Sequence, residues 1–172
     1  GTQIPQLGFY RDDWYLLWGA QSKGVEGILS MFQGDRPFVG WLYVFDFSVM
    51  GLSPLNWHVY VLCIKIISAL AMLWLVRSVW SQRKVETLFI TLLFVVYPGF
   101  YQQPNALTYK QLLLSYTASL LSLSLTINAV KAEKMAIKTL LTILAVALSA
   151  FYILIYEALV GMEVVRLLLL WY

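Results

Sequence analysis

The sequence has one cysteine, one histidine and few charged residues of either sign. Cys63 cannot form an internal disulfide, and neither it nor His58 has partners at the spacing of a metal site. Charged residues make up 12% of the 172 residues, well below the roughly 25% of soluble domains. The net charge of +3 comes without a basic stripe, so no nucleic-acid partner is expected. The nucleotide-binding patterns Walker A and GxGxxG are also absent.

Apolar and aromatic residues are abundant instead. Hydrophobic residues make up 60% of the chain, and its 7 Trp, 11 Tyr and 9 Phe suit a protein with two water–lipid interfaces. A helix needs about 20 apolar residues to cross a bilayer. The sequence therefore predicts an all-α, polytopic helical membrane protein with about four to five transmembrane helices. The predicted segments are Trp57–Trp80, Thr87–Phe100, Thr108–Val130, Ala136–Leu159 and the start of another at Met162–Tyr172.

The part of the chain before these segments has shorter amphipathic stretches. Apolar residues of Trp14–Phe32 fall near one helical face, which predicts a helix lying in the membrane interface, although Gly24 and Gly27 weaken that prediction. Asp35 is expected to cap a second helix, Phe38–Met50, which is too short to cross a bilayer. Two in-plane juxtamembrane helices are therefore expected.

The distribution of basic residues predicts the orientation. Lys and Arg flank two short hinges, Ser81–Lys84 and Lys131–Lys134, as they do on the cytoplasmic side of membranes. Residues 1–56 then form the first extracytoplasmic loop, and residues 57–172 form the transmembrane bundle of a multi-pass protein in the cell membrane. The chain starts without Met and stops inside an apolar run, so we expect a piece of a longer protein that lacks the first membrane helix and the C-terminal part.

Two of the spans carry a stripe of small and hydroxylated side chains. Such stripes let membrane helices approach closely and form hydrogen bonds with one another. Helix packing is the main interpretation, and the lining of a hydrophilic cavity is the alternative. The stripes comprise Thr108, Gln111, Ser115, Ser119, Ser122 and Thr126 in one span and Thr142, Ala145, Ser149, Tyr152 and Tyr156 in the next.

Asp12 and Asp13 are the strongest candidates for chemistry. A carboxylate pair at the mouth of a membrane bundle is costly unless it faces water, a cation or a substrate, although an aspartate can also cap the following helix. Lys65 lies two turns into the first span on the same face as His58, where it would pair, snorkel or receive a lipid phosphate. A carboxylate base, cations for a phosphate and aromatic rings for sugar faces suit glycosyl transfer from a lipid-phosphate donor.

The order of motifs resembles that of a known family. The acidic pair is followed by in-plane segments, by Gly34–Pro37, by Leu52–His58 at the opening of a span and by Val96–Phe100 at the end of the next. This order resembles the type-C glycosyltransferases, in particular the dolichyl-phosphate-mannose protein mannosyltransferase-like proteins. The resemblance implies a hexosyltransferase that moves a sugar from a polyprenyl-phosphate-linked donor to an acceptor hydroxyl outside the cytoplasm.

The same resemblance implies roles for individual residues. Asp12 would be the general base and Asp13 its companion. No cofactor is expected from the sequence, and a divalent metal is possible but not indicated. The second outer loop departs from the family, because relatives often have His-Pro and an acid where this chain has Tyr97–Gln103, so a divergent or inactive member is an alternative. The residues expected to bind substrate are Arg11, Arg36, His58, Lys65, Tyr97, Tyr101 and Gln102.

Two other classes of function stay open at this point. In a transporter or flippase, Lys65 and Glu157 would line a substrate path, but the broken helices and the internal repeat of such proteins are not visible here. In a non-catalytic membrane subunit, the small-residue stripes would bind partner helices. The lipid bilayer is a partner under every interpretation.

Overall fold

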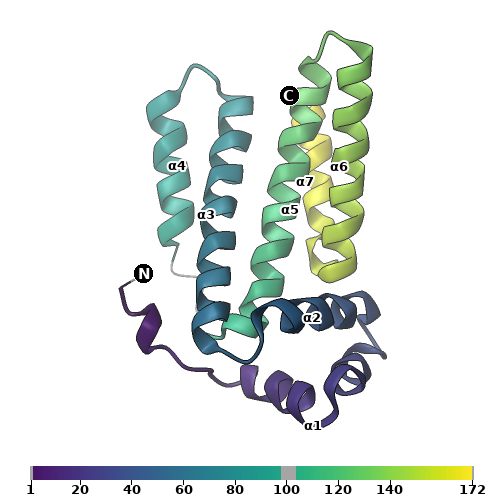
Figure 1. The fold of residues 1–172 in the computed structure, drawn as a ribbon. Helices are drawn as coiled ribbons and strands as arrows, with labels where there is room; N and C mark the ends of the chain where they lie inside the picture. Colours follow the sequence, from purple (N-terminus) through teal and green to yellow (C-terminus); the bar gives the residue numbers. More distant parts are fainter. Residues whose placement is uncertain (1, 98–103, 172) are drawn as a thin grey trace. The chain divides into compact units, whose positions relative to one another are not determined.

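The computed structural model describes residues 2–97 and 104–171, which are almost entirely helical (Figure 1). The predicted all-α fold is confirmed, because the described residues contain no β-strand. The elements are η1 (Ile4–Gln6), α1 (Asp13–Phe32), α2 (Pro37–Met50), α3 (Pro54–Val79), α4 (Lys84–Val96), α5 (Ala106–Lys131), α6 (Met135–Ile155), η2 (Glu157–Val160) and α7 (Gly161–Trp171).

Among the described residues, three helices are long and apolar enough to cross a bilayer. They are α3 and α5, each of 26 residues, and α6, of 21 residues. The other two predicted segments correspond to α4, of 13 residues, and α7, of 11 residues. Both are shorter than the roughly 20 residues of a crossing. The chain is therefore an all-α helical membrane protein with three candidate spans.

The chain divides into two compact units, which we describe separately. Unit 1 comprises residues 1–63 and 99–112, and unit 2 comprises residues 64–98 and 113–172. Unit 1 thus adds the first turns of α3 and α5 to the predicted outer loop. These two turns are important, because they supply most of the polar partners of α1 and α2.

In unit 1, α1 consists of two halves that fold back at Gly24 (Figure 1). Gly24 has φ 58° and ψ −135°, a backbone conformation that residues other than glycine rarely adopt. The halves approach closely, because a Cβ atom added to Gly27 would lie 2.3 Å from the carbonyl oxygen of Gly19. A helix is therefore present over the predicted segment, but its glycines turn it into a tight pair of short helices.

The second short helix, α2, begins at Pro37, one residue before the predicted start at Phe38. The prediction that Asp35 caps this helix is wrong, because Arg36 occupies the N-cap position and makes no capping side-chain hydrogen bond. Proline at the first helical position places the cap on the residue directly before it. The helix ends at Met50, and the N–H of the C-cap residue Gly51, whose φ is 62°, donates to the Phe47 carbonyl oxygen at 3.0 Å.

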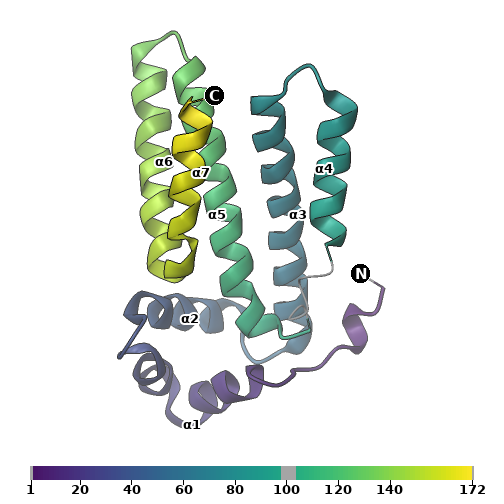
Figure 2. The same ribbon diagram turned by 180° about the vertical axis from the view of Figure 1, so that it is seen from behind.

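Unit 2 has a core between α3 and α5 and a polar contact between α5 and α6. The core contains Ala71 and Leu75 of α3 with Leu120, Leu123 and Ile127 of α5. Figures 1 and 2 both show α5, α6 and α7 side by side.

The small-residue stripes supply the polar contact. Ser122 donates to the Ala145 carbonyl oxygen at 2.6 Å, and its Oγ lies 3.1 Å from that of Ser149. The interpretation of these stripes as helix-packing surfaces is confirmed for these three residues.

Arg166 joins α7 to the rest of unit 2. Its guanidinium donates to Glu163 at 2.7 Å, to Ser122 Oγ at 2.8 Å and to Ser149 Oγ at 2.6 Å, and it also bonds Thr126. Arginine inside a helical membrane bundle is costly unless its donors are paired, and here each guanidinium nitrogen has a partner. This network joins α7 to Ser122 and Thr126 of α5 and to Ser149 of α6.

Candidate functional site

The two adjacent aspartates occupy different environments. The Asp13 side chain is fully buried, and its Oδ1 accepts hydrogen bonds from the Thr108 backbone N–H at 3.1 Å and from the Thr108 hydroxyl at 3.2 Å. Asp12 is exposed and stands at the N-cap position of α1 without a capping side-chain hydrogen bond. The pair therefore presents one carboxylate to the interior of unit 1 and one to its surface.

Enclosure changes the acidity of Asp13. Burial raises its pKa, while the hydrogen bonds from Thr108 act in the opposite direction without cancelling the effect. Its second oxygen, Oδ2, is buried and has no hydrogen-bond partner within residues 2–97 and 104–171. Asp13 therefore holds a proton more readily than an ordinary aspartate does.

Arg11, directly before the pair, has a strained backbone. Its φ of 44° makes it the one non-glycine residue with a positive φ in the described part of the chain. Such conformations cost about 1–3 kcal/mol and are concentrated at functional sites, where the surrounding structure maintains them. The backbone conformation of Arg11 sets the direction in which the chain enters α1 and hence the position of Asp12.

A second polar cluster joins α2 to α5 inside unit 1. Asp46 and Lys110 form an ion pair with side-chain exposures of only 2% and 0%. The Tyr60 hydroxyl lies 3.4 Å from Asp46 Oδ1, and the Lys110 ammonium lies 4.1 Å from the centre of the Tyr43 ring. Burial raises the pKa of the Tyr43 hydroxyl, which donates to the Leu107 carbonyl oxygen at 2.8 Å. The cluster is thus neutral overall and well bonded.

The first turn of α5 is the common anchor of both clusters. Thr108 holds the start of α1 through Asp13, and Lys110 holds α2 through Asp46. Sequence reasoning did not single out Thr108 as an aspartate partner, nor Lys110 at all. The signal was a lysine inside a predicted span together with an aspartate in an apolar helix, since both are rare without a partner. These contacts place the first turn of α5 within the candidate site.

The predicted substrate-binding residues of unit 1 lie in three places. His58 is buried in the first turn of α3, and its Nε2 lies 2.9 Å from the Gly8 carbonyl oxygen, which holds the N-terminal segment. Arg36 is half-buried at the start of α2, and Arg11 is exposed beside Asp12. His58 therefore has a structural partner already, whereas Arg11 is accessible next to the exposed carboxylate.

The remaining predicted residues lie elsewhere. Lys65 is half-buried in α3 and Tyr97 is exposed directly after α4, and both belong to unit 2. Tyr101 and Gln102 lie outside the described residues. The structure thus assigns Arg11, Asp12 and the anchor Asp13 to one stretch of unit 1.

No three or more His, Cys, Asp or Glu side chains are grouped to hold a metal ion within the described ranges. Comparisons with family models, curated proteins and solved structures find no match for this chain. The function is therefore inferred from the chemistry of the chain itself.

Proposed function

We propose that the chain is part of a multi-pass membrane glycosyltransferase that moves a sugar from a polyprenyl-phosphate-linked donor to an acceptor hydroxyl. The observation that supports this most is the contrast within the aspartate pair: Asp13 is buried and fixed by Thr108, and Asp12 is exposed. A general base needs an accessible oxygen on a rigid support. Asp12 has that combination, and it follows the strained Arg11.

In the proposed reaction, the Asp12 carboxylate removes the proton from the acceptor hydroxyl. The acceptor oxygen forms a bond to the anomeric carbon of the donor sugar, and the bond from that carbon to the phosphate oxygen breaks. The electron pair of the broken bond leaves with the polyprenyl phosphate. Arg11 is the nearest cation along the chain to neutralise the charge on the departing phosphate.

Asp13 acts as a positioning residue in this proposal. Its bonds to Thr108 connect the first turn of α1 to the first turn of α5, so the neighbouring Asp12 is held at a defined place. Asp13 itself cannot reach an acceptor while its carboxyl is enclosed.

The membrane placement belongs to the same proposal. The linkers at 80–83 and 132–134 lie on the cytoplasmic side, and residues 1–56 lie outside. The exposed aromatic side chains of α1 and α2 suit a position in the interface, where such rings collect. Trp14 and Phe45, for example, are each more than 60% exposed.

The test is sugar transfer by the full-length protein in proteoliposomes, with radiolabelled polyprenyl-phosphate mannose and polyprenyl-phosphate glucose as donors. Removal of a general base by Asp12→Asn is expected to lower kcat by about 100-fold or more. Asp35→Asn, which removes another exposed carboxylate of unit 1, is the matched control and leaves turnover unchanged. Full turnover in Asp12→Asn would exclude the proposed base.

Transport is the second candidate function. A cavity of about 590 Å³ in unit 2 is lined by Lys138, Glu163 and Arg166 among mostly apolar residues. Ionisable residues inside a membrane bundle often mark a substrate path. Movement of the labelled lipid across the bilayer without a covalent product, in the same proteoliposomes, would favour this function.

A further inference from the structure

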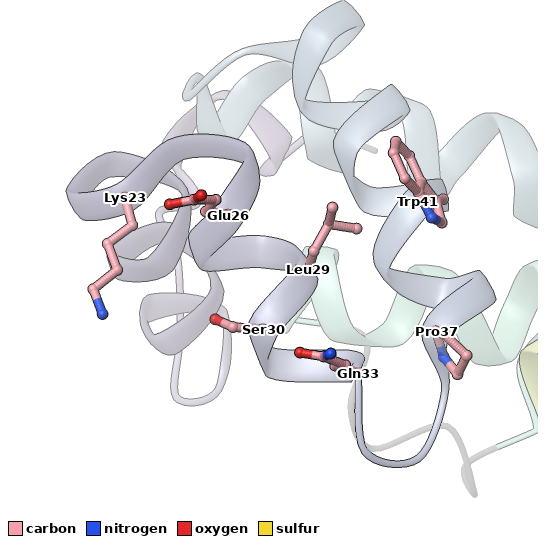
Figure 3. A pocket seen from close by; sticks show the side chains of 7 residues that line it. All are labelled: Lys23, Glu26, Leu29, Ser30, Gln33, Pro37 and Trp41. Atoms are coloured by element: carbon pink, nitrogen blue, oxygen red, sulfur yellow. The ribbon is translucent and has the colours of Figure 1, made fainter.

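A hollow in unit 1 lies between the second half of α1 and the start of α2 (Figure 3). Its volume of about 500 Å³ is within the range of roughly 300–1,000 Å³ of small-molecule sites. Neither Asp12 nor Asp13 lines it. The hollow is therefore a feature separate from the aspartate pair, and its lining residues indicate what it can bind.

Close glycine contacts fix the walls of this hollow. A Cβ atom added to Gly40 of α2 would lie 3.3 Å from Leu29 Cδ2 and 3.3 Å from Phe32 Cβ of α1. The contact between Gly19 and Gly27 holds the two halves of α1 together in the same way. A ligand would thus meet a site that is already formed, which reduces the entropy cost of binding.

The lining combines an aromatic surface with several polar groups. Trp41 of α2 is 61% exposed and supplies the aromatic surface, Leu29 of α1 adds apolar surface, and Glu26, Ser30 and Gln33 supply oxygen and nitrogen atoms (Figure 3). This combination suits a sugar ring, whose C–H face packs on an indole and whose hydroxyls bond to carboxylate, amide and hydroxyl groups.

The charges of the lining exclude two other classes of ligand. One lysine, Lys23, is balanced by one glutamate, Glu26, so the hollow does not select a phosphate or another strong anion. A single carboxylate is also too few for a divalent cation, which takes several oxygen ligands. From the aromatic surface and the balanced charge, we infer that the hollow binds a neutral saccharide.

A smaller cavity is lined by both halves of α1. It has a volume of about 100 Å³, shares Lys23 and Ser30 with the hollow, and reaches Tyr15 and Trp18 in the first half of α1. Tyr15 lies three residues after Asp12, so the two share one face of the helix. This inference rests on the proposed function: the saccharide is part of the acceptor whose hydroxyl Asp12 deprotonates.

Binding is tested by saturation-transfer NMR on the full-length protein in nanodiscs, with neutral oligosaccharides of glucose, mannose, galactose and N-acetylglucosamine as probes. At least one probe is expected to bind saturably, and Trp41→Ala is expected to weaken that binding about tenfold, as loss of one stacking ring does. Phe45→Ala is the matched control, because Phe45 is an exposed aromatic residue one turn further along α2 that does not line the hollow.

Three results would overturn the inference. One is the absence of saturable binding by every sugar probe, and another is equal binding by wild type and Trp41→Ala. The third is displacement of a bound sugar by glycerol phosphate, which would indicate a lipid headgroup site.

The transfer assay separates this inference from the proposed function. Asp12→Asn is expected to keep sugar binding and lose turnover, whereas Trp41→Ala is expected to raise the acceptor KM with a smaller effect on kcat. Saccharide binding together with full turnover in Asp12→Asn would refute the base and leave the binding site intact. Loss of turnover in Asp12→Asn, together with an absence of sugar binding by the wild type, would support the base and refute the saccharide site.

Discussion

At the scale of single residues, burial distinguishes Asp13 from its neighbour Asp12. Thr108 supplies two donors to one carboxylate oxygen, but the other oxygen is buried without a partner in the described part of the structure. Such a group stabilises the fold best in its protonated form, since its ionised form is neither hydrated nor fully bonded. Asp12 is exposed, so its side chain has no comparable cost of desolvation.

The stability of the wild type is therefore expected to depend on the ionisation of Asp13. Burial raises the folded-state pKa of Asp13 above its unfolded value of about 3.9, so its contribution is complete below that value and is lost as the pH rises through the folded pKa. Asp13→Asn keeps the oxygen that Thr108 needs and cannot ionise. As the pH rises above about 4, the melting temperature of the wild type should fall relative to that of Asp13→Asn.

Thermal unfolding in detergent measures this difference directly. Asp12→Asn is the matched control. Because Asp12 is exposed, the difference in melting temperature between the wild type and Asp12→Asn should be almost independent of pH. If the difference in melting temperature between the wild type and Asp13→Asn is the same at all pH values, the pKa of Asp13 is not raised in the folded state.

At the scale of helices, the fold of α1 depends on glycines that permit two halves to touch. The Gly27 position leaves no room for a methyl group, because the Gly19 carbonyl oxygen would be 2.3 Å away. Gly27→Ala is expected to separate the halves and to destabilise the protein by about 1–3 kcal/mol, as other overpacked positions do. The separation also removes the wall of the hollow beside Ser30 and Lys23.

The measurement is the melting temperature in detergent, compared with that of Gly34→Ala. Gly34 has open space around its Cα atom, so its substitution should change stability little. Equal melting temperatures for the two variants would mean that the close approach within α1 does not contribute to stability.

Helices could be predicted from sequence because their signals are local. Apolar runs and hinges located α3, α5 and α6 to within a few residues, whereas the fold-back at Gly24 within α1 was not predicted. The cap of α2 was misplaced, since Asp35 is a favourable cap residue but Pro37 fixes the N-cap position at Arg36. Local propensity therefore predicted the presence of a helix better than the residue that caps it.

The contacts of the site could not be predicted in the same way. Asp46 and Lys110 are 64 positions apart, and Asp13 and Thr108 are 95 positions apart. No periodicity links such distant residues, and a lone sequence does not say which buried aspartate meets which buried lysine. The sequence identified the aspartate pair but not the burial that distinguishes its two members.

At the scale of the whole molecule, the proposed orientation places residues 1–56 outside the cytoplasm. Cys63 is the single cysteine, so a Cys63→Ala background permits labelling at chosen sites. Gly34→Cys should react with a membrane-impermeant maleimide on intact cells. Ser81→Cys, in the linker between α3 and α4, should react only after permeabilisation. Labelling of Ser81→Cys on intact cells, with protection of Gly34→Cys, would reverse the orientation.

The central claim is that Asp12 is the base and Asp13 its support. The most direct measurement compares kcat for sugar transfer in Asp12→Asn and Asp13→Asn, prepared side by side in proteoliposomes. Asp12→Asn should lose about 100-fold or more, whereas Asp13→Asn should keep most of its turnover, because its carboxamide oxygen can still accept both Thr108 bonds. Loss of turnover in Asp13→Asn with full activity in Asp12→Asn would contradict this account.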